Sequence, residues 1–276
     1  MREAASLTFI PVGGLANRVN AIGAAIRLCA DHNKKLKIFW FKDWGMGAGF
    51  HDLFTLSEKA KDVTVIDAQW YHYLYDRPHK YTRWLPRLYQ RLKFDALFYA
   101  KSPALLLFQK WFPVNFNKRS LYVTQYLNFY TNSDNSFYLH PTEAIRSKIE
   151  TRLSTLPSRT IGIHIRRTDM QKSIVESPTT LFIEKMKSEI AADPTTCFYV
   201  ASDSVEEKKA LIDLWGDKII TRENFVRRDT KEGIIEAVVE LYTLASTQKI
   251  YGSSGSSYSM LASELKNTPI EILTQC

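Results

Sequence analysis

Two adjacent arginines, with an aspartate close behind them, stand at the end of an apolar stretch in the second half of the chain. The segment reads TIGIHIRRTDM over residues 160–170. Its first part is rich in β-branched residues and predicts a buried strand from Thr160 to Ile165. A guanidinium group binds phosphate oxygens by two-point contact and keeps its charge at any working pH. The segment therefore indicates a site for an anionic ligand where this strand ends.

Side-chain alternation along the predicted strand separates the two arginines. His164 and Arg166 share one face, and Arg167 lies on the other. One arginine then faces the ligand while the other is held by a carboxylate, for which Asp169 is the nearest candidate in the chain. The alternative is a purely structural arginine–aspartate pair at a domain junction, which explains one arginine more easily than both.

Two glycine-containing loops have the composition of anion cradles. In PVGGLANR, residues 11–18, the glycines let the backbone approach a ligand, and the helix that follows aims N–H groups at an anion. Asn17 adds a donor there and Arg18 a charge. In YGSSGSSYS, residues 251–259, hydroxyls, Gly255 and a helix start make a similar cradle, although serine-rich turns often serve only as helix caps.

A further polar cluster, YVASDS, ends a strand with Asp203 and Ser204, which are placed to accept hydrogen bonds from a ribose or a base. The chain has no GxGxxG sequence after a strand and no P-loop, so dinucleotide sites and Walker-type ATP sites find no support. Its three cysteines lie far apart and without CxxC spacing. This predicts neither a disulfide framework nor a zinc site, and it favours a cytoplasmic protein.

The elements that position these clusters alternate in the second half of the chain. Strands are expected at 160–165, 197–201, 218–221, 249–252 and 270–273, with helices at 178–191, from 204, at 231–246 and to about 265. Ser177 caps the first of these helices with Pro178 as its first residue, and Ser204 with Glu207 predicts a capping box. Single helices between strands predict right-handed crossovers and a parallel sheet, which binds ligands beyond the carboxyl ends of its strands.

The first half reads differently. Strands are expected at 7–12, 36–41 and 63–66 and a helix at 17–31, whereas residues 70–130 look irregular. The segment at 129–141 is the best linker candidate. The fold class expected is therefore α/β, and the chain length and this linker predict two domains, at 1–140 and 141–276. No run of about 18 apolar residues is present, so no membrane-spanning helix is expected.

Residues 70–120 carry ten basic residues against two aspartates, and fourteen of the thirty-five aromatic residues of the chain. The excess of basic residues in this window equals the net charge of the whole protein, +8. Such interleaving is compatible with single-stranded nucleic acid, a membrane surface or an anionic ligand, and equally with a soluble face over an aromatic core. The segment ALLLFQKWFPV, residues 104–114, together with Arg83, Arg87 and Arg91 on one helix face, favours an anionic bilayer among these partners.

Three segments, IGIHIRRTD, FYVASDS and EAVVELYTLASTQKIYGSSGSSYSMLASEL, resemble in order and separation the donor-site motifs of the α1,6-, α1,2- and protein O-fucosyltransferase superfamily. GGLANR is similar to the GGxxNQ-type loop of the α1,2 and protein O-fucosyl branches. The resemblance is strong over residues 160–265, and the window at 70–130 matches nothing in the superfamily. It implies a GT-B fold, in which two Rossmann-like domains with parallel sheets flank a ligand cleft. It also implies GDP-fucose as donor substrate, inversion at the anomeric carbon, and neither a cofactor nor a metal.

The resemblance also implies residue roles. Arg166 binds the β-phosphate, His164 lies beside the nucleotide, and Asp203 faces the ribose or guanine. A carboxylate on the long helix binds guanine, with Glu240 as the candidate and Glu236 as the alternative. The other donor-binding positions implied are Ser256, Ser257, Gly14 and Asn17.

This sequence departs from the superfamily pattern in three places. Met170 stands where the α1,6 branch has lysine, and Ser204 replaces the second of two acids. Ile174 occupies the position of a glutamate, with Glu176 two residues late. Catalysis is therefore assigned to Arg166, with Glu176 or Asp169 as the base that deprotonates the acceptor.

Three functions remain open from the sequence. The first is a fucosyltransferase, or a transferase of another GDP-sugar, that acts in the bacterial cytoplasm on lipid-linked or surface glycans and contacts the inner membrane peripherally through residues 70–120. The second is a non-catalytic relative that binds nucleotide-sugars or glycans. The third is a polyanion-binding protein, which would leave the motifs of the second half without a purpose, so nucleic acid is not the partner expected.

Overall fold

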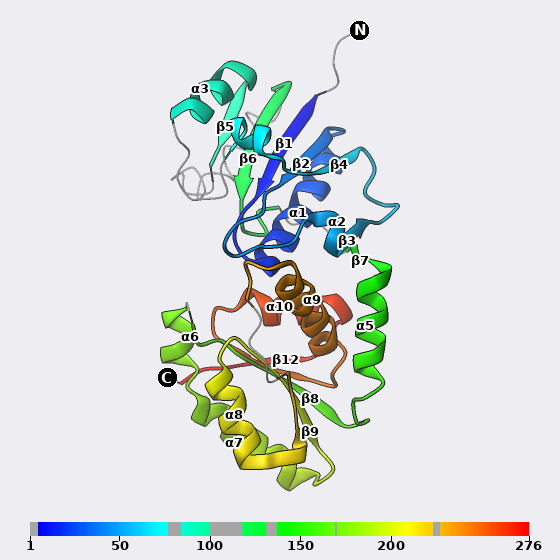
Figure 1. Cartoon of the computed structure of the whole chain (residues 1–276), viewed down its shortest axis with the longest axis vertical. Coiled ribbons are helices and arrows are strands. Elements are labelled where there is room, and N and C mark those ends of the chain that lie inside the picture. The colour runs from blue at the N-terminus through cyan, green and yellow to red at the C-terminus, as the bar shows by residue number, and fades with distance from the viewer. Residues whose placement is uncertain are drawn as a thin grey trace. The chain divides into compact units, whose positions relative to one another are not determined.

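A computed structural model describes residues 5–76, 84–99, 118–130, 137–168, 170–222 and 227–275. The chain divides into two compact units. The first contains residues 1–142 together with 228–235, and the second contains 143–227 together with 236–276. Each unit is built around one five-stranded sheet in which every pair of neighbouring strands is parallel (Figure 1).

In the second unit the strand order is β10-β9-β8-β11-β12. These strands are β8 (Thr160–Ile165), β9 (Cys197–Ser202), β10 (Ile219–Ile220), β11 (Ile250–Ser253) and β12 (Ile270–Leu273). The first strand in the chain lies at the centre and the order runs outward in both directions, which is the doubly wound Rossmann arrangement. The predicted bounds of β8 and β12 are confirmed.

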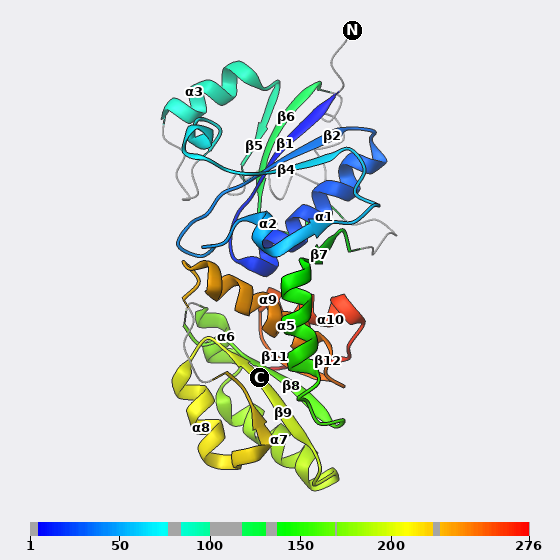
Figure 2. The ribbon, with the colours of Figure 1, turned by 45° about the vertical axis from the view of Figure 1, so that its right-hand side comes forward.

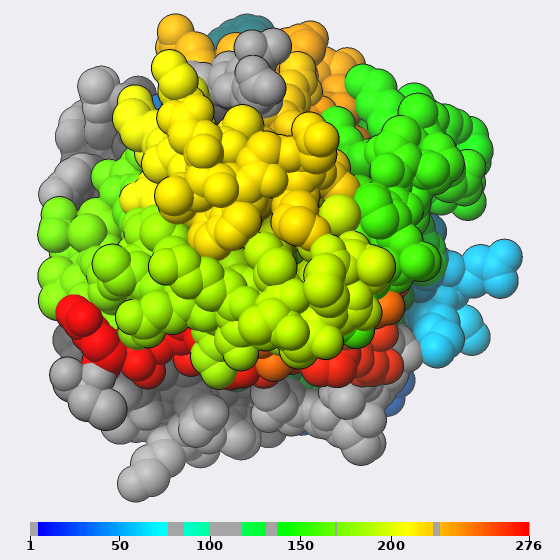
Figure 3. Space-filling model, turned by 90° about the horizontal axis from the view of Figure 1, so that it is seen from below, coloured from blue at the N-terminus to red at the C-terminus, as the bar shows by residue number. Residues whose placement is uncertain are grey.

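Helices cover both faces of this sheet (Figures 1 and 2). One face is covered by α7 (Thr179–Ala192) and α8 (Val205–Trp215), whose Phe182 and Leu211 are buried against strand residues such as Ile163. Figure 3 shows this side of the unit, with α7 and α8 spread over it. The opposite face is covered by α5 (Glu143–Leu153), α9 (Lys231–Ala245) and α10 (Ser257–Lys266).

The central strand has room for its helices because Gly162 lacks a side chain. A Cβ atom at Gly162 would lie 2.6 Å from Cδ1 of Leu244 on α9 and 2.7 Å from Oγ1 of Thr247. Both neighbours are buried, so neither can move into solvent. Helix α9 therefore packs directly on the backbone of β8.

Replacing Gly162 by alanine is expected to lower the free energy of unfolding by about 1–3 kcal/mol, because the added methyl group overpacks a closed interior. Urea denaturation of the whole protein measures the change. Gly23→Ala is the matched control, because a Cβ there meets only the guanidinium end of the Arg27 side chain, at 3.3 Å. It lies within a helix, where alanine should raise the stability by about 0.5–1 kcal/mol. Equal effects at the two positions would contradict the packing argument.

In the first unit the strand order is β4-β2-β1-β6-β5. The strands are β1 (Ser6–Pro11), β2 (Lys35–Trp40), β4 (Val63–Asp67), β5 (Ala96–Phe98) and β6 (Ser120–Gln125). Helix α1 (Leu15–Asp31) connects β1 to β2 and buries an almost continuous run of small and aliphatic residues. The short helix α2 (Phe50–Leu53) and strand β3 (Phe54–Leu56) follow β2, and β3 pairs antiparallel with β7 (Leu139–Pro141).

The expectation of irregular structure over residues 70–130 is wrong for the described part of that window. It contains the 3₁₀ helix η1 (Trp70–Leu74), helix α3 (Trp84–Lys93), and strands β5 and β6. Strand β6 pairs with β1 along its whole length, and its Leu121, Tyr122 and Val123 are fully buried. A short apolar run far along the chain from its partner has no local signal that identifies it as a central strand. Residues 77–83 and 100–117, which include Arg83 and the ALLLFQKWFPV segment, lie outside the described residues.

Other expectations are corrected in detail. The linker expected at 129–141 ends instead in β7, whose pairing with β3 buries Leu139 and Pro141; residues 131–136 lie outside the described part. Helix α5 and the short helix α6 (Gln171–Glu176) are not expected from the sequence. Pro178 is the N-cap of α7 rather than its first residue.

No helix among the described residues is both long enough and apolar enough to cross a bilayer.

Candidate anion-binding site

The predicted site lies where the strand order of the second sheet reverses. Strand β8 pairs with β9 on one side and with β11 on the other. The chain leaves β8 toward α7 on one face of the sheet and leaves β11 toward α10 on the other face, so the loops after these two adjacent strands diverge. Ligands of doubly wound sheets bind at this point, outside the carboxyl ends of the strands. The hydroxyl of Ser253 ties the two loops together, because it accepts a hydrogen bond from the Arg166 N–H and donates one to the His164 carbonyl, both at 3.1 Å.

The two arginine side chains contact different carboxylates, since Arg167 pairs with Glu207 and Arg166 with Asp203. Arg167 Nε lies 2.9 Å from a carboxylate oxygen of Glu207 on α8, and its Nη2 donates to the Ser177 carbonyl and the Thr179 hydroxyl, both at 2.9 Å. Its side chain is therefore fixed against α7 and α8. Asp169, the partner expected from sequence, lies outside the described residues.

The capping box predicted from Ser204 and Glu207 is half correct. The Ser204 hydroxyl accepts the N–H of Glu207 at 3.2 Å, as an N-cap does. The Glu207 carboxylate does not return to Ser204. It accepts hydrogen bonds from Arg167 and Thr179, which come from elsewhere in the unit. Glu207 thus holds Arg167 in the loop that follows β8.

Asp203 organises the turn after β8. One of its carboxylate oxygens accepts the Arg167 N–H at 2.7 Å, and the other accepts the Thr168 hydroxyl at 2.6 Å. The Arg166 Nε lies 3.2 Å from that second oxygen. Burial raises the pKa of Asp203, but the Thr168 hydroxyl and the Arg166 charge outweigh it and hold the pKa below its ordinary value. The carboxylate is therefore ionised and orients the Arg166 side chain; the role in ribose or guanine binding remains a prediction.

The lowered pKa of Asp203 predicts a pH effect on stability. A carboxylate whose pKa is lower in the folded state stabilises the fold above its unfolded pKa, about 3.9, and this contribution disappears as the pH falls through the folded value. Asp203→Asn should therefore destabilise the protein clearly at pH 6 and much less at pH 3. Urea denaturation of both proteins at the two pH values measures this. A difference that does not change with pH would contradict the assignment.

His164 lies on the same face of β8 as Arg166 and is buried. Its ring is stacked on Tyr258 with 5.0 Å between centroids, and its Nδ1 lies 3.4 Å from the hydroxyl of Ser256. Ser256 is the N-cap of α10, and Ser257 is the first residue of that helix. The amino end of α10, which carries the positive end of the helix dipole, thus lies beside His164. Tyr258, which holds the imidazole by stacking, is not expected from the sequence.

The loop between β11 and α10 requires Gly255. Its φ is +70°, in the left-handed region that side chains seldom adopt. This turn brings Ser254 against α6, where the Ser173 hydroxyl donates to the Ser254 carbonyl at 2.5 Å and the Ser254 hydroxyl donates to the Glu176 carboxylate. Glu176, one candidate for the base, therefore lies in this loop cluster, although its carboxylate is engaged by a hydroxyl and lies 4.0 Å from Lys172.

The two carboxylates proposed for guanine lie in a buried charged cluster on α9. Glu240 lies 3.5 Å from the amino group of Lys208, and burial raises its pKa above the ordinary value despite that charge. Glu236 pairs with Arg152 of α5 and, at 2.6 Å, with Arg222 after β10. The basic partners come from three elements separated in sequence, so no local pattern indicates them. Both carboxylates are already engaged by basic side chains, and their contact with a base remains a prediction.

The GGLANR loop belongs to the first unit and is described there alone. Gly13 has a φ of +90°, and Gly14 is the N-cap of α1, which places Asn17 in its first turn. The expectation that Arg18 adds charge to a ligand site is wrong. Its side chain is 1% exposed, with Nη2 at 2.7 Å from Asp43 and the guanidinium stacked over Trp40. Arg18 instead braces the loop from inside.

No group of three or more histidine, cysteine, aspartate or glutamate side chains in the described ranges is arranged to hold a metal ion. The site residues of the second unit that the structure brings together are His164, Arg166, Asp203, Glu176, Ser256 and Ser257, with Glu240 in the neighbouring cluster on α9. They arrange cationic and hydroxyl groups and a helix start beyond two adjacent strands, an arrangement suited to an anionic ligand.

No protein-family profile matches the chain, and no curated protein matches it in sequence. Solved structures do. The NodZ α-1,6-fucosyltransferase co-crystallised with GDP superposes with a TM-score of 0.65 and 15% identity, over 94% of this chain and 92% of that one. Fucosyltransferase NodZ from Bradyrhizobium gives a TM-score of 0.63 and 14% identity, over 94% and 93% of the two chains. POFUT1 in complex with GDP-fucose gives 0.61 and 10%, over 99% and 98%. The chain therefore has the GT-B fold of these structures, as expected from the sequence.

Proposed function

We propose that the protein is an inverting glycosyltransferase that moves fucose from GDP-fucose to a hydroxyl group of a glycan and needs no metal ion. The observation that carries this proposal is the placement of Arg166 just beyond β8, where its backbone N–H is hydrogen-bonded to Ser253 of the loop that leads into α10. The likeness of fold to structures determined with GDP and GDP-fucose supports it.

In the proposed reaction the acceptor oxygen forms a bond to the anomeric carbon as the bond from that carbon to the β-phosphate oxygen breaks. The electron pair of the broken bond remains on GDP, which leaves with one more negative charge. Arg166 and the N–H groups at the start of α10 stabilise this charge as it develops. A carboxylate base takes the proton of the acceptor hydroxyl, and Glu176 and Asp169 remain the candidates.

We further propose that the acceptor is a lipid-linked or surface glycan of a bacterium and that the protein acts in the cytoplasm, at the inner membrane. A second candidate function is binding of a nucleotide-sugar without transfer. The hydroxyl that engages Glu176 favours it, because a base must be available to the acceptor. Transfer of another GDP-sugar is the third possibility, since the fucose pocket is not identified by any residue above.

Calorimetric titration of GDP, GDP-fucose, GDP-mannose and UDP-glucose into the protein, with EDTA present, tests the donor. Binding of GDP and GDP-fucose without metal supports the proposal, and release of GDP or fucosyl transfer distinguishes an enzyme from a binding protein. Binding of GDP-mannose in preference to GDP-fucose would identify mannose, rather than fucose, as the sugar of the donor. Failure of every GDP compound to bind would contradict the proposed function.

A further inference from the structure

Helix α3 of the first unit exposes two leucines to solvent. Leu88 is 48% exposed and Leu92 is 80% exposed, whereas Gln90 is fully buried. Gln90 fixes this orientation, because its amide donates to the Tyr75 carbonyl and accepts the Tyr99 hydroxyl at 2.5 Å. A helix that covers a core normally does the reverse. Leu88 and Leu92 are therefore held away from the interior by a polar anchor.

The 3₁₀ helix η1 next to α3 also exposes large apolar side chains. With three residues per turn, positions three apart share a row. His72 and Tyr75 form the inner row, with rings 4.9 and 4.5 Å from the ring of Phe39. The residues of the two outer rows are exposed: Trp70, Tyr71, Tyr73 and Leu74, with Trp70 at 80%.

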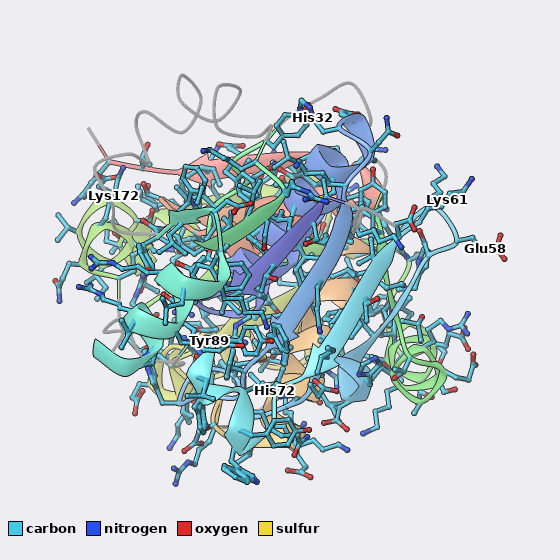
Figure 4. All side chains as sticks on the ribbon, turned by 90° about the horizontal axis from the view of Figure 1, so that it is seen from above. His32, Glu58, Lys61, His72, Tyr89 and Lys172 are labelled. Atoms are coloured by element: carbon cyan, nitrogen blue, oxygen red, sulfur yellow. The ribbon has the colours of Figure 1, made fainter. Side chains whose placement is uncertain are left out.

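Tyr75 joins the two elements. Its carbonyl accepts Gln90, its hydroxyl accepts Lys93 at 2.5 Å, and its ring contacts Tyr89 with 5.4 Å between centroids. Figure 4 labels Tyr89 on α3 and His72 on η1. We call the outward residues Trp70, Tyr71, Tyr73, Leu74, Leu88 and Leu92 the η1–α3 surface.

Apolar exposure in the described ranges is concentrated here. Eleven large hydrophobic side chains are exposed there, and six of them form the η1–α3 surface. Single exposed apolar residues are normal on soluble proteins, but a gathering of them marks a binding surface.

The charges around this surface are positive. Arg87, Arg91 and Lys93 are exposed on α3, between and beside its leucines. Of the two aspartates in the described parts of this region, Asp76 is buried and Asp95 accepts the N–H of Ser120. An exposed tryptophan, tyrosines and leucines on η1 and α3, with arginines and a lysine on α3, match the interface of a bilayer that carries anionic headgroups.

We propose that the η1–α3 surface docks the protein on an anionic membrane, with Leu88, Leu92 and Trp70 inserted among the headgroups and Arg87, Arg91 and Lys93 paired with lipid phosphates. This placement goes beyond the proposed transfer reaction and does not depend on it. It would bring a soluble donor and a membrane-borne acceptor to the same enzyme.

Co-sedimentation of the intact protein with vesicles tests the proposal. We expect binding to phosphatidylcholine vesicles that contain phosphatidylglycerol, much weaker binding to phosphatidylcholine alone, and loss of binding as salt is raised. The double variant Leu88→Gln/Leu92→Gln should weaken binding at least about tenfold at unchanged charge. Arg87→Gln/Arg91→Gln should weaken it about fivefold for each arginine.

Leu214→Gln is the matched control, because Leu214 is 56% exposed on α8 of the other unit. It should bind vesicles as the original protein does. The proposal is overturned if no vesicles bind at low salt, or if the control weakens binding as much as the α3 variants. It is also overturned if the protein does not bind vesicles but forms a dimer that Leu88→Gln/Leu92→Gln dissociates, which would assign the surface to a second copy of the chain.

Discussion

Replacing Arg166 by alanine is expected to lower the rate of fucosyl transfer by about a hundredfold to a thousandfold, the usual cost of removing one donor that stabilises a developing negative charge. The reason is local. Asp203 lies 3.2 Å from the Nε of Arg166, and the Ser253 hydroxyl accepts its backbone N–H, so both fix Arg166 just beyond β8, in the loops where the leaving diphosphate is proposed to bind. Initial rates at saturating GDP-fucose, with far-ultraviolet circular dichroism to confirm folding, measure the effect.

Two further variants test whether the loss of rate comes from the guanidinium group itself, rather than from the loss of a charge or of the fold. Arg166→Lys keeps a charge but loses the fork that binds two phosphate oxygens, so it should recover only part of the lost rate. Arg159→Ala is the matched control, because Arg159 stands just before β8 and pairs with Asp193 at 3.2 Å, away from the proposed site. It should transfer fucose normally. An Arg166→Ala protein that is folded and fully active would remove Arg166 from the mechanism.

Replacing Arg18 by methionine should destabilise the first unit by about 3–5 kcal/mol, the usual cost of breaking a buried ion pair by removing one partner. The Arg18 side chain is 1% exposed and that of Asp43 is 7% exposed. Arg18 also donates to the Gly13 carbonyl at 2.9 Å and to the Phe41 carbonyl at 2.6 Å. Its loss leaves a carboxylate and two carbonyl groups without a cation in the interior.

Hydrogen exchange of amides in β1 and β2, together with urea denaturation of the whole chain, measures the loss of stability in the first unit, which contains Arg18. Arg18→Met/Asp43→Asn should recover part of the stability, because the uncompensated charge is gone. Arg146→Ala is the control, since the Arg146–Glu143 pair is exposed and such pairs contribute about 0–1 kcal/mol. Equal effects of Arg18→Met and Arg146→Ala would show that burial does not decide the cost.

Local patterns predicted the elements of the second unit well because each depends on residues close together in sequence. The apolar run from Thr160 to Ile165 is a strand with those bounds, and the Ser204 N-cap is formed. Pairings across the fold could not be predicted in this way. Arg167 is paired with Glu207, 40 residues along the chain, which no local pattern indicates. The topology that places α8 beside β8 decides that pairing.

The same limit explains the errors in the first unit. Arg18 reads as a surface charge in a glycine loop, but its partner, Asp43, follows β2 and is 25 residues away. The strand β6 reads as part of an irregular region, although it pairs with β1 from Ser6 to Pro11. Tyr258 is identified only by its stacking on His164. In each case the missing information is which distant segments become neighbours.

The grouping of residues 228–235 with the first unit has a consequence for how the chain can be divided. Within that unit the Arg228 carbonyl accepts the Gly47 N–H at 2.8 Å, and Lys231 lies 2.6 Å from Asp52. A Cβ at Gly47 would lie 2.3 Å from the backbone of Asp229, so the fit there is close. A gene cut after residue 142 would thus yield an N-terminal fragment that lacks eight residues of its own structure. We expect the two halves to reconstitute poorly as separate polypeptides.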